Sequence, residues 1–227
     1  MELMSTQRIA KTLLNTYVGA RTGARVLSGG IRRGHGETIR AVIWINDLRR
    51  FTATSETLER DELIELLNDY FEIVVHAVLA ENGEVLKFIG DGMLAVFELH
   101  AEETPAAYCA AALRAARNAI ATVADRNRVR GDEGRPAIHF GIALHLGEVY
   151  YGNIGAPERL DFTVIGPAVN EASRIEKLGS KLDRIVVTSS KFAAATPEPL
   201  EHVGAYRLGG IAELQEIFAL PISSKVD

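Results

Sequence analysis

Apolar residues recur along the chain with a period of two in some stretches and with helical spacing in others, which predicts an alternation of strands and helices. Short runs rich in β-branched and other apolar residues are separated by turn-forming residues. The predicted strands span residues 39–45, 84–89, 93–98, 139–146, 149–151, 161–165, 184–188, 205–208 and 217–220. The hairpin signal Gly90-Asp91-Gly92 joins the second of these strands to the third.

Stretches with helical spacing lie between the predicted strands. The predicted helices span residues 56–80, 103–129, 167–178 and 189–195. Ser55 is in position to cap the first of them, and Pro167 fits the first turn of the third. The resulting order β-α-β-β-α-β predicts an α/β (α+β) fold, a ferredoxin-like sandwich with further strands and a helix at its C-terminal end.

The first 36 residues differ from the rest of the chain. Apolar residues at helical spacing predict one amphipathic helix, which ends near Val18. Glycine and arginine are then interleaved up to Gly36, and repeated glycine disfavours both helix and strand, so we expect a linker. We therefore divide the chain into an N-terminal segment, 1–36, and a domain, 37–227. The segment is interpreted either as a frayed arm or as a connector from an upstream sensory domain outside this chain.

Composition narrows the class of protein. Hydrophobic residues make up 47% and charged residues 24% of the 227 residues, as in soluble globular proteins. A net charge of −5 argues against binding nucleic acid through bulk charge. The single cysteine, Cys109, excludes an intrachain disulfide framework and a thiolate zinc site. The sequence has no apolar run long enough for a membrane span and no signal peptide, so we expect a cytoplasmic protein.

The first candidate for chemistry is the segment Asp47-Leu48-Arg49-Arg50-Phe51-Thr52, directly after the first predicted strand. A carboxylate at the end of a strand, followed by a turn into a helix, suits the binding of a metal–phosphate group. The carboxylate binds the cation, and backbone N–H groups of the turn face phosphate oxygens. By itself, an aspartate in this place is more often a helix cap.

The second candidate is the segment from Lys87 to Gly92. Its glycines leave the carboxylate of Asp91 unobstructed, although the segment alone also fits an ordinary Asp-Gly turn. In a ferredoxin-like sheet, the end of the first strand lies beside the central hairpin. Asp47 and Asp91 are therefore predicted to share a pair of divalent ions, as in two-metal phosphoryl chemistry.

The third candidate is a pair of polar residues on the helix that begins at Pro167. Asn170 and Arg174 are four residues apart, so they point the same way. Side by side, an amide and a guanidinium can hydrogen-bond a ribose and bind a phosphoryl oxygen. The alternative is a solvated helix face on which Arg174 pairs with Glu171.

These three segments, in this order, resemble the catalytic domain of the class III nucleotide cyclases over about residues 38–220. Residues 141–149 and 151–155 resemble the central strand pair of that family. The resemblance implies production of a cyclic nucleotide and pyrophosphate at two divalent metal ions, Mg²⁺ or Mn²⁺. It also implies a homodimer with two shared active sites, because the family builds each site from both chains.

The resemblance further implies a role for each matching residue. Asp47 and Asp91 match the metal-binding aspartates, and the carbonyl of Leu48 matches the backbone ligand. Asn170 matches the residue that orients the ribose, and Arg174 the one that stabilises the transition state. The turn residues that are expected to contact substrate are Arg49, Phe51 and Thr52.

Lys87 and Thr163 fall at the purine-reading positions of the family, as in a bacterial subgroup of adenylate cyclases. An ammonium donates to adenine N1, whereas guanine N1–H needs an acceptor. A threonine hydroxyl can accept from the adenine amino group or donate to guanine O6. Lys87 therefore predicts ATP as the substrate, an adenylate cyclase activity and a role in intracellular signal transduction.

Two departures from the family pattern keep alternatives open. Arg50 stands where the family usually has glycine, and residues 208–211 contain no lysine, although many members carry one there to reach the triphosphate. The alternatives are a guanylate cyclase and a catalytically weak nucleotide-binding or dimerisation module. A diguanylate cyclase fits poorly, because its GG(D/E)EF hairpin is replaced here by Gly90-Asp91-Gly92.

Overall fold

The computed structural model describes residues 2–27, 29, 34–100, 103–211 and 213–221. The helices are α1 (Glu2–Val18), α2 (Ala20–Leu27), α3 (Phe51–Thr57), α4 (Arg60–Ala80), α5 (Pro105–Asp132), α6 (Pro167–Lys181) and α7 (Ser190–Ala195). The strands are β1 (Gly36–Leu48), β2 (Glu84–Ile89), β3 (Gly92–Glu98), β4 (Phe140–Ala156), β5 (Arg159–Ile165), β6 (Val186–Ser189), β7 (Glu201–Arg207) and β8 (Leu214–Ala219).

All eight strands belong to one mixed sheet in the order β2-β3-β1-β4-β6-β8-β7, with β5 paired to β4 outside this path. The first four strands have the order β2-β3-β1-β4, which confirms the ferredoxin-like arrangement expected from the sequence. The C-terminal additions extend the sheet beyond β4, where β6 pairs with β4 in parallel.

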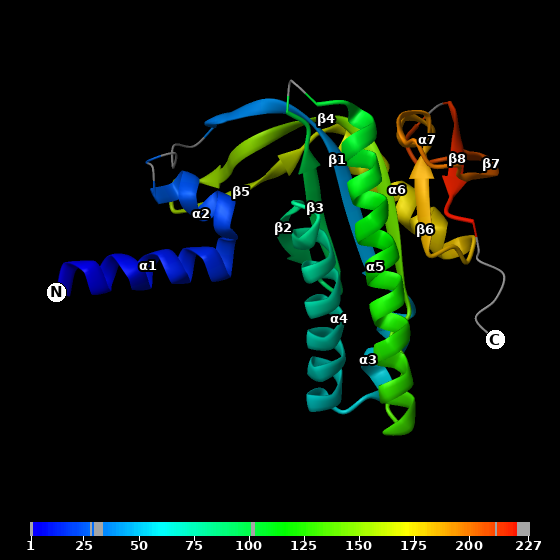
Figure 1. Ribbon diagram of the computed structural model, residues 1–227, viewed down its shortest axis with the longest axis horizontal. Coiled ribbons are helices and arrows are strands. Elements are labelled where there is room, and N and C mark those ends of the chain that lie inside the picture. Colours follow the sequence, from blue (N-terminus) through cyan, green and yellow to red (C-terminus); the bar gives the residue numbers. More distant parts are fainter. Residues whose placement is uncertain (1, 28, 30–33, 101–102, 212, 222–227) are drawn as a thin grey trace.

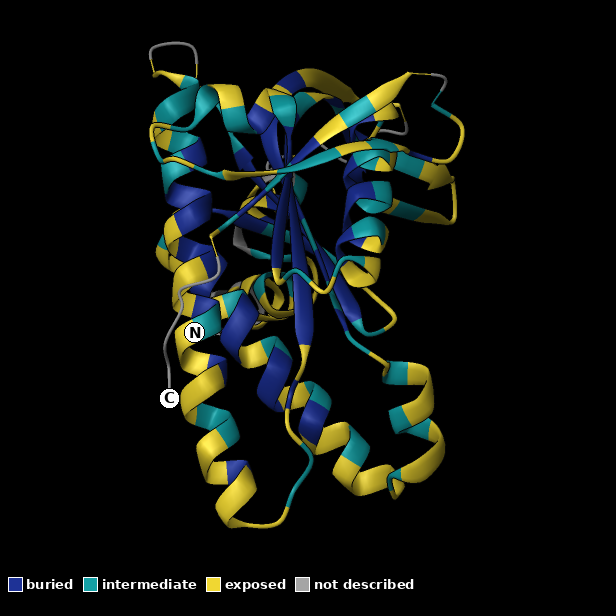
Figure 2. Ribbon diagram, turned by 90° about the vertical axis from the view of Figure 1, so that its right-hand side faces the viewer, coloured by how far each residue is buried: buried dark blue, intermediate teal, exposed yellow. Residues whose placement is uncertain are grey.

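Helices cover both faces of the sheet. The long helices α4 and α5 lie side by side over one face (Figure 1). Because side chains alternate along a strand, Val42 and Trp44 of β1 pack toward these two helices, whereas Ala41 and Ile43 pack toward α6 on the other face. The strands in the middle of the sheet are accordingly buried (Figure 2).

The helix predicted over residues 56–80 is wrong at its N-terminal end, because two helices occupy this stretch. The chain is extended at Leu58 and Glu59, between α3 and α4. Ser55 lies inside α3, where its hydroxyl donates to the carbonyl of Thr52, so it is not the cap. Leu58 packs against the core in this extended conformation. Because it also fits the helical spacing of the apolar residues, nothing in the sequence indicates that the helix is interrupted there.

One long strand, β4, replaces the two strands predicted around Gly147. Its partner β1 pairs with it from Gly36–Gly152 to Leu48–Phe140 without interruption. Gly147 marks a close approach rather than a strand end, because a Cβ there would lie 2.6 Å from the Cβ of Ala168 on α6.

The N-terminal segment contains a second helix, which the sequence did not predict. Helix α2 forms across Gly23 and is anchored by Thr22, a buried residue that donates to Glu84 of β2 at 3.2 Å. A Cβ on Gly23 would lie 3.3 Å from the Cβ of Leu14, so the glycine lets α1 and α2 pack closely. Residues 30–33 of the expected linker lie outside the described residues, and the division at residue 36 stays a prediction.

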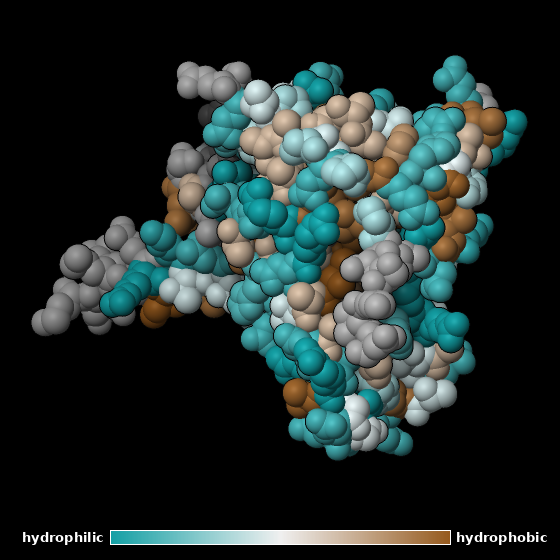
Figure 3. Space-filling model, turned by 45° about the vertical axis from the view of Figure 1, so that its right-hand side comes forward, coloured by the Kyte–Doolittle hydropathy of each residue, from teal (hydrophilic) through white to brown (hydrophobic). Residues whose placement is uncertain are grey.

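Helix α1 extends away from the sheet (Figure 1). Apolar side chains on it, including Ile9 and Leu13, are exposed, and the projecting arm carries hydrophobic surface in Figure 3. In the part of the chain that the structure describes, no helix is long and apolar enough to cross a membrane.

Candidate active site

Asp47 and Asp91 lie side by side at one end of the sheet. Asp47 is the next-to-last residue of β1 and pairs with Gly92, directly after Asp91. The two carboxyl groups are within hydrogen-bonding reach. Burial, followed by the charges of Asp91 and Glu176, raises the pKa of Asp47 from 3.8 to about 7. The predicted pairing of the two aspartates is thus present in a single chain.

Gly92 makes this approach possible. A Cβ at that position would lie 2.5 Å from the carbonyl oxygen of Asn46 and 3.0 Å from Oδ1 of Asp47. Any side chain there would push the hairpin away from the end of β1. The glycine therefore has a steric role that its place in a turn alone does not reveal.

The residues fit a divalent cation. Carboxylate and backbone carbonyl oxygens are the ligands that Mg²⁺ and Mn²⁺ prefer, and the repulsion that raises the pKa of Asp47 is relieved by a bound cation. The described residues contain no cluster of three or more His, Cys, Asp or Glu side chains able to hold a metal ion. The ligand set of Asp47, Asp91 and the carbonyl of Leu48 therefore stays a prediction.

A buried polar chain supports the end of β1 from the opposite face. The indole of Trp44 donates to Asn46 at 2.5 Å, and the amide of Asn46 donates to the hydroxyl of Tyr70 at 2.5 Å. All three side chains are buried. This network holds the strand beside Asp47, and sequence reasoning missed Asn46 because a single polar residue in an apolar strand carries no pattern of its own.

The turn after β1 contains a left-handed residue. Arg50 has φ 58° and ψ 25°, and its carbonyl accepts the N–H of Thr54 at 3.0 Å. Glycine adopts this conformation at least cost, which explains why a glycine suits this position. The side chain of Arg50, the N-cap residue of α3, makes no capping hydrogen bond with the first turn of this helix among the described residues. Contacts of Phe51 and Thr52 with substrate stay predictions.

The backbone N–H and the guanidinium of Arg49 both have hydrogen-bond partners within the protein. Its backbone N–H donates to the carbonyl of His139 at 2.7 Å, and its guanidinium donates to Glu176 at 2.6 Å. A contact of Arg49 with substrate therefore stays a prediction, without support from the observed hydrogen bonds.

Lys87 of β2 forms an ion pair with Asp161 of β5. Asp161 and Thr163 are two residues apart on β5 and thus lie on the same face of the strand. Thr163 is 4% exposed, and its hydroxyl has no hydrogen-bond partner among the described residues. Lys87 therefore pairs with a residue on the strand face that also carries Thr163. Sequence reasoning missed Asp161, because its contact with Lys87 joins two strands that are distant in the sequence.

Asn170 and Arg174 project from the outer face of α6. The inner, buried face of this helix is formed by Ala168, Ala172, Ile175, Glu176 and Gly179. At 100° per residue, Asn170 and Arg174 lie opposite that face. In the same chain, the charges felt by Asp47 include Glu176 on the inner face. Asn170 and Arg174 are thus turned away from their own chain's metal-binding carboxylates.

The alternative of an Arg174–Glu171 pair is not observed. Glu171 instead lies 3.9 Å from Nζ of Lys191 and 3.6 Å from Nδ1 of the buried His145. Within the described residues no hydrogen bond or ion pair holds Arg174. Its Nη2 would be 3.1 Å from a Cβ on Gly210, so the guanidinium lies beside the loop that was singled out for its missing lysine.

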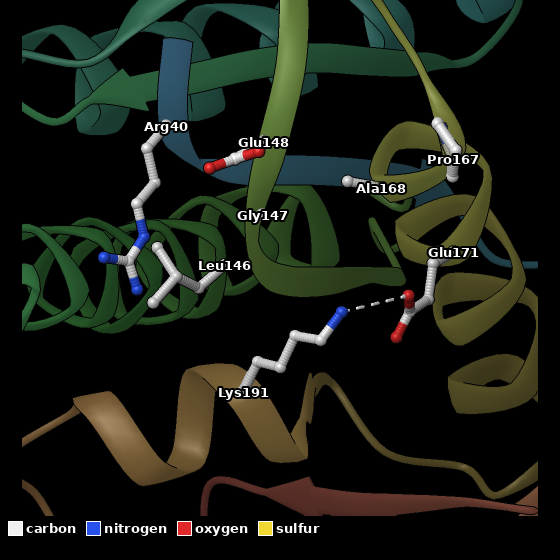
Figure 4. A pocket seen from close by; sticks show the side chains of 8 residues that line it. All are labelled: Arg40, Leu146, Gly147, Glu148, Pro167, Ala168, Glu171 and Lys191. Carbon is white, nitrogen blue, oxygen red and sulfur yellow. Dashed lines mark ion pairs between the residues drawn. The ribbon is translucent and has the colours of Figure 1, made fainter.

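A pocket of the single chain lies elsewhere. It has a volume of about 520 Å³, and its charged lining residues are Arg40, Glu148, Glu171 and Lys191 (Figure 4). A smaller pocket of about 80 Å³ lies behind the turn at Leu48 and Phe51. Neither pocket is lined by Asp47, Asp91, Asn170 or Arg174.

Comparison with known families and proteins gives consistent matches. The model of the adenylate and guanylate cyclase catalytic domain matches residues 37–215. An adenylate cyclase of Anabaena cylindrica is 38% identical over 162 residues, which cover 70% of this chain and 32% of that protein. Adenylate cyclase 1 of Rhizobium meliloti is 30% identical over 154 residues, covering 65% of this chain and 22% of that protein. The chain therefore spans about a third or less of the length of these two relatives.

Solved structures agree on the fold. A bacterial light-regulated adenylyl cyclase has a TM-score of 0.81 and 26% identity, covering 96% of this chain and 63% of that one. The guanylyl cyclase Cya2 has a TM-score of 0.70 and 26% identity, covering 81% of this chain and 92% of that one. Because the two identities are equal, sequence identity to these structures does not choose between adenine and guanine.

Proposed function

The chain belongs to the family of adenylate and guanylate cyclase catalytic domains, and from this premise we propose that it converts ATP to 3′,5′-cyclic AMP and pyrophosphate in intracellular signal transduction. The choice of ATP rests on one observation. The ammonium of Lys87 pairs with Asp161, which lies two residues before the buried Thr163 on the same face of β5, and the hydroxyl of Thr163 has no partner among the described residues.

These two groups match the edge of adenine. Lys87 donates to N1, which is an acceptor, and the hydroxyl of Thr163 accepts from the 6-amino group. Guanine would present an N1–H donor to the ammonium, and an unmatched buried donor pair costs on the order of 1–3 kcal/mol. The pair with Asp161 keeps Lys87 directed toward β5, which favours ATP.

GTP is the second candidate substrate, and the same ion pair is the observation that favours it. The carboxylate of Asp161 is an acceptor and would pair with guanine N1–H if it turned away from Lys87. Lys87 and Thr163 would then both donate to O6. This arrangement requires the ion pair to open, whereas the adenine arrangement preserves it.

Asp47, Asp91 and the carbonyl of Leu48 would hold two divalent ions, Mg²⁺ or Mn²⁺. Such ions lower the pKa of the ribose 3′-hydroxyl and neutralise charge on the triphosphate when they are bound. The role of the two aspartates is to present deprotonated oxygens at the end of β1. The raised pKa of Asp47 means that a proton competes for this position near neutral pH.

Asn170 and Arg174 act on the ribose and the reacting phosphate. The amide of Asn170 holds the ribose so that its 3′-oxygen is in line with the α-phosphate. The guanidinium of Arg174 donates to phosphoryl oxygens as negative charge grows on them in the transition state. The absence of protein partners for Arg174 within the described residues supports this role, because its donors remain available.

The positions of these groups support a homodimer with two shared sites. Asn170 and Arg174 are turned away from Asp47 of their own chain, so a second copy related by a two-fold axis would supply the missing half of each site.

The test is an assay of the purified chain with ATP or GTP, in Mg²⁺ or Mn²⁺, with cyclic AMP and cyclic GMP measured separately. We expect metal-dependent cyclic AMP formation and a clear preference for ATP. A preference for GTP would overturn the role given to Lys87 and favour the Asp161 arrangement.

A catalytically weak nucleotide-binding or dimerisation module is the other alternative. Arg50 in a left-handed conformation and a loop without lysine beside Arg174 favour it. Binding of ATP without any cyclic product, with Mn²⁺ present and dimers demonstrated, would support the module and exclude the enzyme.

A further inference from the structure

Arg49 and Glu176 form a shielded ion pair between the end of β1 and the inner face of α6. Nη1 of Arg49 donates to Oε1 of Glu176 at 2.6 Å, and the two side chains are only 16% and 6% exposed. Nη2 also reaches the carbonyl of Arg184, just before β6, at 3.4 Å. Because water screens this pair little, its geometry is held more firmly than that of a surface pair.

The guanidinium of this pair packs against the backbone of β4. A Cβ on Gly141 would lie 1.6 Å from Nη2 and 2.2 Å from Cζ of Arg49. The guanidinium therefore lies directly against the backbone of Gly141, where no other residue would leave room for it. Arg49 is thus held by three elements: β4, α6 and the segment before β6.

Stability alone does not explain such a pair. Removing two charges from water costs free energy, and well-packed apolar residues often stabilise a fold as much or more. Each residue of the pair also lies close in sequence to a predicted catalytic or metal-binding residue. Arg49 is two residues after Asp47, and Glu176 is two residues after Arg174.

We propose that Arg49 and Glu176 are positioning residues that couple the two active sites of the dimer. The proposal rests on the proposed function, in which Asp47 of one chain works with Arg174 of the other. Within one chain, Asp47 and Arg174 then belong to different sites. The ion pair links the metal-binding end of β1 in one site to the helix that carries Arg174 in the other.

The test uses heterodimers with a single intact site. Asp47→Asn chains and Arg174→Ala chains, carrying different purification tags, are mixed to form the reference heterodimer. Its live site combines the aspartates of the Arg174→Ala chain with Asn170 and Arg174 of the Asp47→Asn chain. Activity of this reference tests the shared site itself, separately from the coupling. A reference that forms but is inactive would overturn the shared sites, and the coupling would fall with them.

Glu176→Gln is then added to one chain at a time. In the Arg174→Ala chain it leaves Arg49 unpaired beside the aspartates of the live site, and we expect the metal concentration for half-maximal rate to rise about tenfold at nearly constant kcat. In the Asp47→Asn chain it loosens the helix that carries the working Arg174, and we expect kcat to fall about tenfold at an unchanged metal requirement.

Glu81→Gln is the matched control, because it removes the same charge from an exposed pair with Arg114 between α4 and α5. If Glu176→Gln does not fold, the paired change Arg49→Met with Glu176→Met removes both charges at similar volume, and we expect the same split between the two placements. Effects no larger than those of the control, or identical effects in both placements, would overturn the proposal.

Discussion

Lys87 and Asp161 form an ion pair between β2 and β5, two strands that the sheet does not pair with one another. β2 pairs with β3, whereas β5 pairs with the far end of β4. The pair therefore depends on how the β4–β5 hairpin folds over the face of the sheet. It directs the ammonium of Lys87 to the strand that carries Thr163, and this arrangement leads to the first prediction.

Asp161→Asn is expected to raise the KM for ATP by up to about fivefold and to reduce the preference for ATP over GTP. Lys87 and Asp161 are 31% and 57% exposed, so the pair contributes no more than about 1 kcal/mol. Steady-state kinetics with both nucleotides measure the effect. Glu198→Gln, which breaks the exposed pair with Arg117, is the control. Unchanged selectivity would contradict a role for Asp161 in directing Lys87.

Thr163→Val is expected to weaken ATP binding without weakening the fold. The buried hydroxyl has no partner in the described structure, so an isosteric methyl group leaves the free energy of unfolding equal or higher. The lost acceptor for the adenine amino group should raise the KM for ATP by about tenfold. Thermal unfolding and kinetics are measured on the same samples.

Thr188→Val is the matched control for this change, because Thr188 on β6 is also buried with an unpartnered hydroxyl. Both variants should keep their stability, and only Thr163→Val should change the KM. Equal kinetic effects of the two variants would show that Thr163 acts through packing.

The closeness of Asp47 and Asp91 could be predicted from the sequence, because it depends on local patterns and on a known strand order. The end of β1 and the β2–β3 hairpin are neighbours in any sheet of this topology, and the register Asp47–Gly92 bears this out. The pairs Lys87–Asp161 and Arg49–Glu176 could not be predicted in this way. Both join elements distant in the sequence, and their contacts depend on hairpin curvature and on glycine-sized gaps that no periodicity records.

In the N-terminal segment, too, the sequence failed to predict a feature that depends on contacts distant in the sequence. Glycine lowers helix propensity, and on that basis α2 was expected to be a linker. The buried contact of Thr22 with Glu84, together with Tyr151 donating to the same carboxylate at 2.6 Å, outweighs this cost. Tertiary contacts of this kind are invisible to local propensity, so the helix could be found only in the structure.

Asp47→Asn is expected to stabilise the metal-free protein at high pH. The pKa of Asp47 is raised from 3.8 to about 7 in the folded state, so ionisation costs stability increasingly as pH rises through this interval. Below pH 4 both states bind the proton and the cost vanishes. The variant should therefore unfold a few degrees higher than the wild type at pH 8, and at the same temperature near pH 4.

With a divalent metal present at pH 8, the wild type should instead unfold at a higher temperature than Asp47→Asn. Mg²⁺ or Mn²⁺ binds only the folded wild type with its full set of oxygens and stabilises it by mass action, whereas the variant gains little. Thermal scans with metal and with a chelator measure both effects. The control is Asp125→Asn, which changes an exposed carboxylate paired with Arg128. A wild type that is insensitive to metal at pH 8 would argue against the ligand set.

Arg50→Gly is expected to raise the free energy of unfolding by about 1 kcal/mol. Arg50 has φ 58°, a conformation that costs a residue with a Cβ roughly 1 kcal/mol and glycine almost nothing. Asn82→Gly, at φ 59°, is the control and should gain less, because asparagine tolerates this region. Chemical denaturation of the two variants and the wild type measures the difference. An equal gain in unfolding free energy for both variants would contradict a greater backbone strain at Arg50 than at Asn82.

Arg50→Ala separates the side chain's charge from the backbone conformation. It removes the guanidinium but keeps a Cβ, so the unfolding free energy should not rise. Arg50 is an exposed cation beside the turn that is expected to bind the triphosphate, and we expect both Arg50→Ala and Arg50→Gly to raise the KM for ATP about twofold to fivefold, less at high salt. A lower KM in both variants would mean instead that the side chain crowds the turn, and that a glycine there makes the better enzyme.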